Sequence, residues 1–158
     1  MAKKEENEIK KQYEKISKKL NLPDYKTLNE EFDIAKIGES ETILRDIRKS
    51  MMLKMSSALQ FVEILLNPST GNMFHMFLVK GVTSEDKQIL DELFDKLGEI
   101  EIYSYERDIT YNEEKEAEFI TEKFKDWKEM QKKLDKLTKR LKESWRKIQF
   151  KKSRSYFG

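Results

Sequence analysis

Cysteine is absent from this chain of 158 residues, which also has only one histidine, two prolines and five glycines. The absence of cysteine excludes disulfide bonds and thiolate metal sites, and it favours a reducing compartment such as the cytoplasm. The scarcity of glycine and proline predicts few turns and long helices. The longest apolar run covers residues 76–79, far short of a membrane span, and the charged first residues indicate no secretory signal. We therefore expect a cytoplasmic protein without a membrane partner.

Residue patterns typical of catalysis are also missing. The glycines do not have the spacing of a phosphate-binding loop or a dinucleotide-binding fingerprint. A di-iron bundle requires Glu-x-x-His motifs on two helices, but the only histidine, His75, has Asn72 three residues before it. Asp91, Asp95 and Glu99 recur every four residues, a row that can bind a hard cation but is also common on a solvated helix face. We favour the solvated face and expect no catalytic residue, no metal site and no cofactor.

Apolar residues recur at helical spacing through most of the chain. The pattern predicts a helix over about 5–20, a short one capped by Asp24, and a long one from 39 or 40 to about 66. It also predicts a short helix over 73–80, capped by Asn72 and ended by Gly81. The next helix starts with a capping box of Thr83 and Asp86, and its apolar face continues past Tyr103 to Ile109. The last helix runs from its cap Asn112 to 149, with Glu116 in its first turn and Trp127 and Trp145 on its apolar seam. The alternation in IEIYSY, residues 100–105, also fits a strand, but the continuing helical stripe favours a helix.

These elements together predict an all-α fold. We expect an up-and-down, four-helix-bundle-like single domain over residues 1–150, with long third and last helices. Residues 151–158, KKSRSYFG, form a basic C-terminal tail that we expect to be flexible.

The net charge of only +2 is spread unevenly along the chain. Residues 85–118 contain thirteen acidic and four basic residues, whereas residues 122–154 contain five acidic and fourteen basic residues. Such a basic stretch is compatible with nucleic-acid binding, because phosphate backbones attract stripes of cations. The candidate nucleic-acid-binding residues are Lys128, Lys132, Lys136, Lys139, Arg140, Arg146, Lys151, Lys152 and Arg154. The alternative is that the basic helix lies beside the acidic one, so that the charges complement each other within the bundle.

Residues 71–79 lack any carboxylate, lysine or arginine in a chain of which charged residues make up 39%. If this stretch is a helix, its methionines and phenylalanines make it apolar nearly all round, which indicates burial in the chain's own bundle or in a partner. The candidate partner-binding residues are Met73, Phe74, Met76 and Phe77. His75 between them is most simply a histidine at the edge of a core, and a haem site using it is the remote alternative.

Together, these features predict a non-enzymatic helical-bundle protein that acts as a protein–protein interaction module. Its partner is another protein or a second copy of the chain, bound through the Met/Phe segment. The alternative function is that of a nucleic-acid-binding accessory protein using the basic last helix and tail. A small-ligand or metal-binding bundle is a more remote alternative, because the predicted helix seams supply almost no polar group to a cavity.

Overall fold

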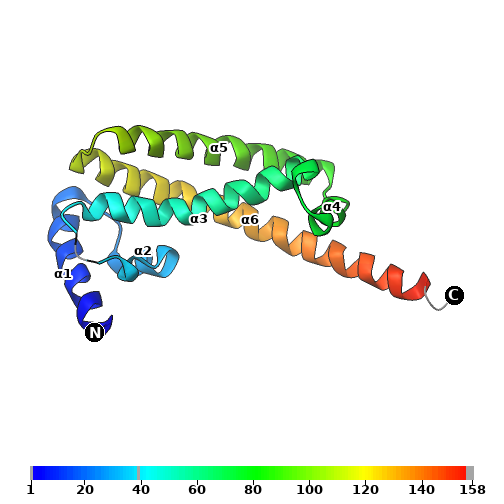
Figure 1. Cartoon of the computed structure of the whole chain (residues 1–158), viewed down its shortest axis with the longest axis horizontal. Helices are drawn as coiled ribbons and strands as arrows, with labels where there is room; N and C mark the ends of the chain where they lie inside the picture. Colours follow the sequence, from blue (N-terminus) through cyan, green and yellow to red (C-terminus); the bar gives the residue numbers. More distant parts are fainter. Residues whose placement is uncertain (1, 39, 156–158) are drawn as a thin grey trace. The chain divides into compact units, whose positions relative to one another are not determined.

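The computed structural model describes residues 2–38 and 40–155, together with the side chains of residues 8–38, 40–149 and 151. The elements are α1 (Ala2–Leu20), α2 (Tyr25–Phe32), η1 (Ile34–Lys36), α3 (Ile43–Leu66), η2 (Pro68–Thr70), α4 (Met73–Val79), α5 (Ser84–Ile109) and α6 (Glu113–Ser155) (Figure 1). Over these residues the fold is entirely helical, so the predicted all-α, bundle-like fold class is confirmed. The IEIYSY stretch lies within α5 and is helical, as predicted.

Most predicted helix ends agree with the structure, and the differences have local causes. The side chains of Asp24, Asn72 and Asn112 cap α2, α4 and α6 as predicted. Helix α3 begins at Ile43, later than predicted, because the Ser40 hydroxyl accepts the backbone N–H of Thr42 in a turn that precedes the helix. Residue 39, the other predicted start, lies outside the described residues.

The last helix is longer than predicted. It has 43 residues and continues beyond residue 149, through most of the segment that we predicted to be a flexible tail. Residues 156–158, the end of that tail, lie outside the described part of the chain.

The chain divides into two compact units. The first comprises the residues up to Ser57 together with Glu99–Trp127, and the second comprises Ala58–Gly98 together with the residues from Lys128 onward. Helices α3, α5 and α6 therefore each contribute residues to both units. A single domain over residues 1–150 stays a prediction.

In the first unit, α1 docks through Ile9 and Tyr13, which are both fully buried. The Tyr13 hydroxyl donates to the backbone oxygen of Pro23 at 2.6 Å, and its ring packs against that of Tyr25. Burial, with a smaller contribution from the negative charge of Asp24, raises the pKa of Tyr13 well above its usual value. The Gln12 amide donates to the backbone oxygen of Ser40 at 2.8 Å, so α1 is held by polar as well as apolar contacts.

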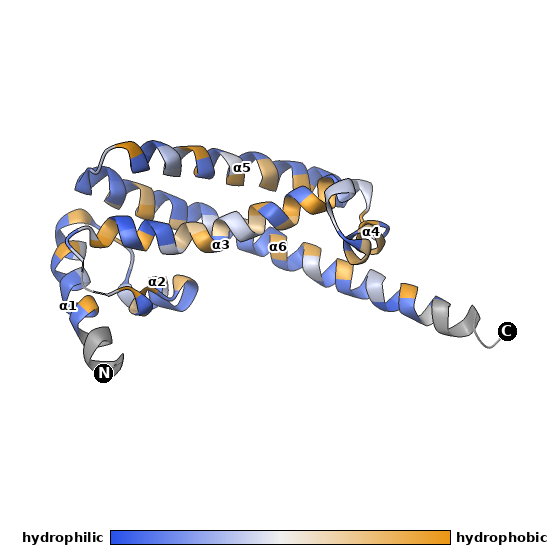
Figure 2. Ribbon diagram, in the orientation of Figure 1, coloured by the Kyte–Doolittle hydropathy of each residue, from blue (hydrophilic) through white to orange (hydrophobic). Residues whose placement is uncertain are grey.

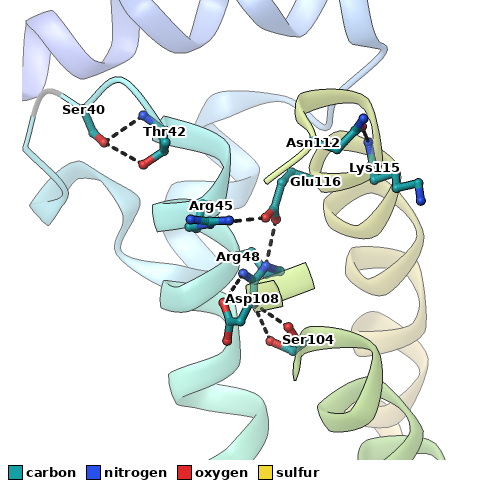
Figure 3. A network of polar contacts seen from close by, with 9 residues as sticks. All are labelled: Ser40, Thr42, Arg45, Arg48, Ser104, Asp108, Asn112, Lys115 and Glu116. Carbon is teal, nitrogen blue, oxygen red and sulfur yellow. Dashed lines mark hydrogen bonds and ion pairs between the residues drawn. The ribbon is translucent and has the colours of Figure 1, made fainter. Parts of the chain in front are cut away.

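A buried arginine joins three helices of the first unit (Figure 3). Arg48 on α3 is 1% exposed and donates to Glu116 on α6 at 2.7 Å, to the Ser104 hydroxyl on α5 at 2.6 Å and to Asp108 on α5 at 2.5 Å. Glu116 is fully buried, and its second oxygen lies 3.8 Å from Arg45 Nε. The hydrogen bond from Arg48 lowers the pKa of Asp108. The apolar pattern alone did not predict this polar core.

The core of the second unit is apolar. It is built from the end of α3, the first half of α5 and the second half of α6. Its buried side chains include Val62, Leu65, Leu78, Leu90, Leu93, Leu97, Met130, Leu137 and Leu141. Except for Met130, which the predicted seam of the last helix omitted, the residues from α3, α5 and α6 lie on the helix stripes that the sequence predicted. Helix α4 contributes only Leu78.

Candidate protein-interaction surface

The short helix α4 is fixed in place by its flanking residues in the second unit. The Asn72 side chain caps the helix by accepting a hydrogen bond from the backbone N–H of His75 at 3.3 Å. The same side-chain oxygen lies 2.8 Å from the ring nitrogen Nδ1 of His75. A Cβ at Gly71 would lie 2.8 Å from the Cβ of His75, and one at Gly81 would lie 2.2 Å from the Ser144 hydroxyl on α6. Glycine is therefore required at both ends of the segment for close approach.

The predicted stop at Gly81 has a different basis from the one we expected. We predicted that Gly81 ends the helix as a C-terminal glycine, a role that usually requires a left-handed conformation. No described glycine has a positive φ, and Lys80, which caps α4, is right-handed. Gly81 is required instead because the chain passes close to Ser144.

Most of the predicted partner-binding residues on α4 are exposed. Met73 is 73% exposed, Met76 57% and Phe74 49%, whereas Phe77 is half-buried with Lys80 Nζ 4.6 Å from its ring centroid. Figure 2 shows α4 mostly in the hydrophobic colour. Only Leu78 of this helix is fully buried, whereas Phe77 and Val79 are half-buried. Met73, Phe74 and Met76 are the large apolar side chains that α4 exposes.

An aromatic side chain from α6 extends this exposed region. The ring of Trp145 lies 5.1 Å from that of Phe74 in an edge-to-face arrangement, and Trp145 is itself half-buried. We call Met73, Phe74, Met76, Phe77 and Trp145 the α4 surface. The sequence placed Trp145 only on the seam of the last helix. Its contact with α4 could not be predicted, because the two residues are 71 positions apart.

The start of α5 is tied to α6 beside this surface. Thr83 and Asp86 form the predicted capping box: the Thr83 N–H donates to Asp86 at 3.0 Å, and the Asp86 N–H donates to the Thr83 hydroxyl at 3.1 Å. Asp86 is fully buried and also forms an ion pair with Arg140 on α6. One carboxylate therefore caps α5 and binds the neighbouring helix.

Acidic residues of α5 pair with basic residues of α6 along the second unit. Glu85 lies 3.6 Å from Lys136 and 3.4 Å from Arg140. Glu92 accepts a hydrogen bond from Lys133, which lowers the pKa of Glu92. Further along, Lys96 lies 3.9 Å from Glu129. The order of these pairs shows that the two helices run antiparallel, and part of the basic helix faces the acidic one, as one of our two sequence interpretations expected.

The candidate nucleic-acid-binding residues consequently differ in their surroundings. Lys136 and Arg140 pair with α5, and Lys139 pairs with Asp135 on its own helix at 2.6 Å. Of the others, Lys128 is half-buried and Lys132, Arg146 and Lys151 are exposed, whereas the side chains of Lys152 and Arg154 lie outside the described ones.

A second exposed apolar group lies on α5 in the first unit. Ile102 is 68% exposed, Tyr105 61% and Ile109 83%. Their spacing of three and four residues places them on one face of the helix, and we call them the α5 stripe. We expected residue 109 to extend the buried face of this helix, and that expectation was wrong, because the buried face ends at Ser104.

The described side chains offer little for a metal or a small ligand. Among them, no group of three or more histidine, aspartate or glutamate side chains could hold a metal ion, and the row of Asp91, Asp95 and Glu99 is exposed on α5. His75 is half-buried against Phe74, with ring centroids 5.3 Å apart. No described helix has the length and apolar character that crossing a bilayer demands.

Comparison with protein-family models, with curated proteins and with solved structures gave no match to this chain.

Proposed function

We propose that this protein is a non-enzymatic interaction module that binds another protein through the α4 surface. The observation that carries the proposal is the exposure of Met73, Phe74 and Met76 side by side in a chain whose surface is otherwise highly charged. Clustered exposed apolar residues of this kind are typical of interaction sites. Methionine suits such a site because its unbranched, polarisable side chain adapts to a partner's shape.

The way in which α4 is held supports the same proposal. Three contacts order the helix in the absence of a partner: the Asn72 cap, the buried Leu78 side chain and the close approach of Gly81 to Ser144. A surface that is ordered in advance loses less conformational entropy on binding. Met73 and Met76 are each more than half exposed, so burial within the chain does not account for their apolar character, and a partner explains it best.

A photo-crosslinking amino acid at Met76 tests the proposal in cells that make the protein. Leu53 is the matched control position, because it is an exposed apolar residue of α3 in the first unit. We expect a defined protein adduct from position 76 and not from position 53. The purified partner should then bind the chain, and Met73→Ser should raise the Kd about tenfold or more.

Two results would contradict the proposal. One is an adduct pattern from position 76 that does not differ from the pattern at position 53. The other is adducts with nucleic acid only, which would favour the alternative based on exposed cations such as Lys132 and Arg146. In that case, anisotropy with labelled DNA and RNA should show binding that weakens steeply as the salt concentration rises.

A further inference from the structure

Helix α5 supplies carboxylates that neutralise basic residues of α6 up to Arg140, and the basic end of α6 extends past the start of α5. In the antiparallel pairing, Glu85 near the start of α5 already meets Lys136 and Arg140. Helix α5 begins at Ser84, so no residue of α5 remains to pair with the cations after Leu141. These cations are Lys142, Arg146, Lys147 and Lys151, all exposed, with Glu143 as the only carboxylate in residues 142–151. The α4 surface therefore lies beside an unneutralised group of positive charges.

The α5 stripe has the opposite charge around it. Residues 99–109 contain four carboxylates and one arginine, and one of the four, Asp108, is already paired with Arg48. Residues 142–151 contain four cations and one carboxylate. Glu99 and Glu106 are exposed on α5, and Glu106 lies 3.9 Å from Arg107, the one cation of this segment. The α5 stripe, and the α4 surface with the basic end of α6, thus each combine exposed large apolar side chains with nearby charges, and the charges are of opposite sign.

We propose that the α4 surface, with the basic end of α6, binds the α5 stripe of a second copy of this chain. This inference rests on the proposed function and names the partner. Within one chain, the second unit already pairs acidic residues of α5 with basic residues of α6. The proposed contact would form the same kind of pair between two copies. Every copy carries both surfaces, so the α4 surface and the α5 stripe are always present at equal concentration.

The physical chemistry of the two surfaces fits such a contact. Burying Met73 and Met76 against Ile102 and Ile109 removes apolar area from water on both sides. The surrounding charges remain near solvent, where they steer association and fix the register rather than supply most of the affinity. Because exposed charges are screened by ions, the contact should weaken as salt rises. The two surfaces differ, so the interface is heterologous and forms a ring or an open chain of copies.

Sedimentation velocity on the full chain tests the proposal with two double variants. The first, Met73→Glu with Met76→Glu, places negative charge on the α4 surface. The second, Ile102→Lys with Ile109→Lys, places positive charge on the α5 stripe. All four residues are exposed, so the fold should tolerate the changes. Lys26→Glu and Glu30→Lys are controls with the same changes in net charge on exposed sites of α2.

We expect the mean mass of the natural chain to rise with protein concentration at low salt and to fall as salt is added. Each double variant alone should be monomeric, and both α2 controls should associate like the natural chain. An equimolar mixture of the two double variants should associate again to at least a dimer, because it contains one intact pair of surfaces. No contact between two identical surfaces would produce this rescue.

Three outcomes would overturn the inference: a chain that is monomeric at every concentration in low salt, association that survives either double variant, or no rescue on mixing. None of these outcomes affects the proposed function, since crosslinking at position 76 identifies any protein partner independently. Absence of adducts at that position together with salt-sensitive self-association through other residues would contradict both proposals.

Discussion

A single residue, Arg48, shows how a charged group can organise a core. Its guanidinium lies among α3, α5 and α6 of the first unit and donates to both Glu116 and Asp108. A buried ion pair adds little net stability, because removing both charges from water costs about as much as their attraction returns. Its value lies in geometry: the hydrogen bonds are satisfied in only one alignment of the three helices.

Replacing Arg48 by methionine should therefore destabilise the protein strongly. The variant leaves the fully buried Glu116 carboxylate without its main partner, and we expect a loss of about 3–5 kcal/mol in the free energy of unfolding. Urea denaturation followed by circular dichroism measures this loss. Arg45→Met is the matched control, since Arg45 is partly exposed and its Nε lies 3.8 Å from the same carboxylate, so its loss should be much smaller.

The double variant Arg48→Met with Glu116→Met separates the effect of losing Arg48 from the effect of leaving the Glu116 carboxylate unpaired. It removes the unpaired charge as well as the arginine, and we expect it to recover about half or more of the lost stability. Losses that simply add in the double variant would show that Glu116 and Arg48 do not act as a pair.

The sequence could predict the role of a residue where its partner lies only a few positions away, and not where the partner is distant in the chain. Asp24, Asn72 and Asn112 were recognised as caps because each one bonds to a backbone group only three residues away. Arg48 and Glu116 are 68 positions apart, so no local pattern connects them. The glutamate was instead placed by its favourable position in the first turn of the last helix, which is correct but omits its partner.

At the scale of elements, the 3.6-residue period predicted where the helices lie but not which side of α4 faces outward. That helix is apolar nearly all round, so its pattern gives no direction, and only the anchor at Leu78 and the contact of Phe74 with Trp145 define one. The α5 stripe was missed for a related reason: the apolar residues of α5 occupy two faces, and the pattern was assigned to one buried face.

Two glycines of the second unit should respond in opposite ways to alanine. In Gly81→Ala the new Cβ meets Ser144 at 2.2 Å, and separating α4 from α6 should cost about 1–3 kcal/mol. In Gly98→Ala, within α5, the new Cβ has no atom within 4 Å, and the variant should be more stable by about 0.5–1 kcal/mol.

Thermal denaturation compares these variants, and a double-mutant cycle with Ser144→Gly tests the cause. If the close approach matters, Gly81→Ala should cost less when Ser144 is glycine, with a coupling on the order of 1 kcal/mol. An unchanged cost would place the strain elsewhere in the turn. A destabilised Gly98→Ala variant would mean that a neighbour does contact that face.

At the scale of the whole molecule, the two compact units are connected by three shared helices rather than by a linker. Helices α3, α5 and α6 each enter both units, so unfolding one unit exposes helix ends that belong to the other. We therefore predict one cooperative unfolding transition, as the expected single domain over residues 1–150 requires.

The two tryptophans allow this prediction to be checked one unit at a time, because Trp127 is buried in the first unit and Trp145 is half-buried in the second. In Trp145→Phe, tryptophan fluorescence reports only the first unit, and in Trp127→Phe it reports only the second. Within each variant, the urea midpoint from fluorescence should equal the midpoint from circular dichroism, which follows all helices. Trp127→Phe shrinks a buried side chain and should lower both midpoints together. A fluorescence midpoint that departs from the circular dichroism midpoint in either variant would mean that the units unfold separately despite their shared helices.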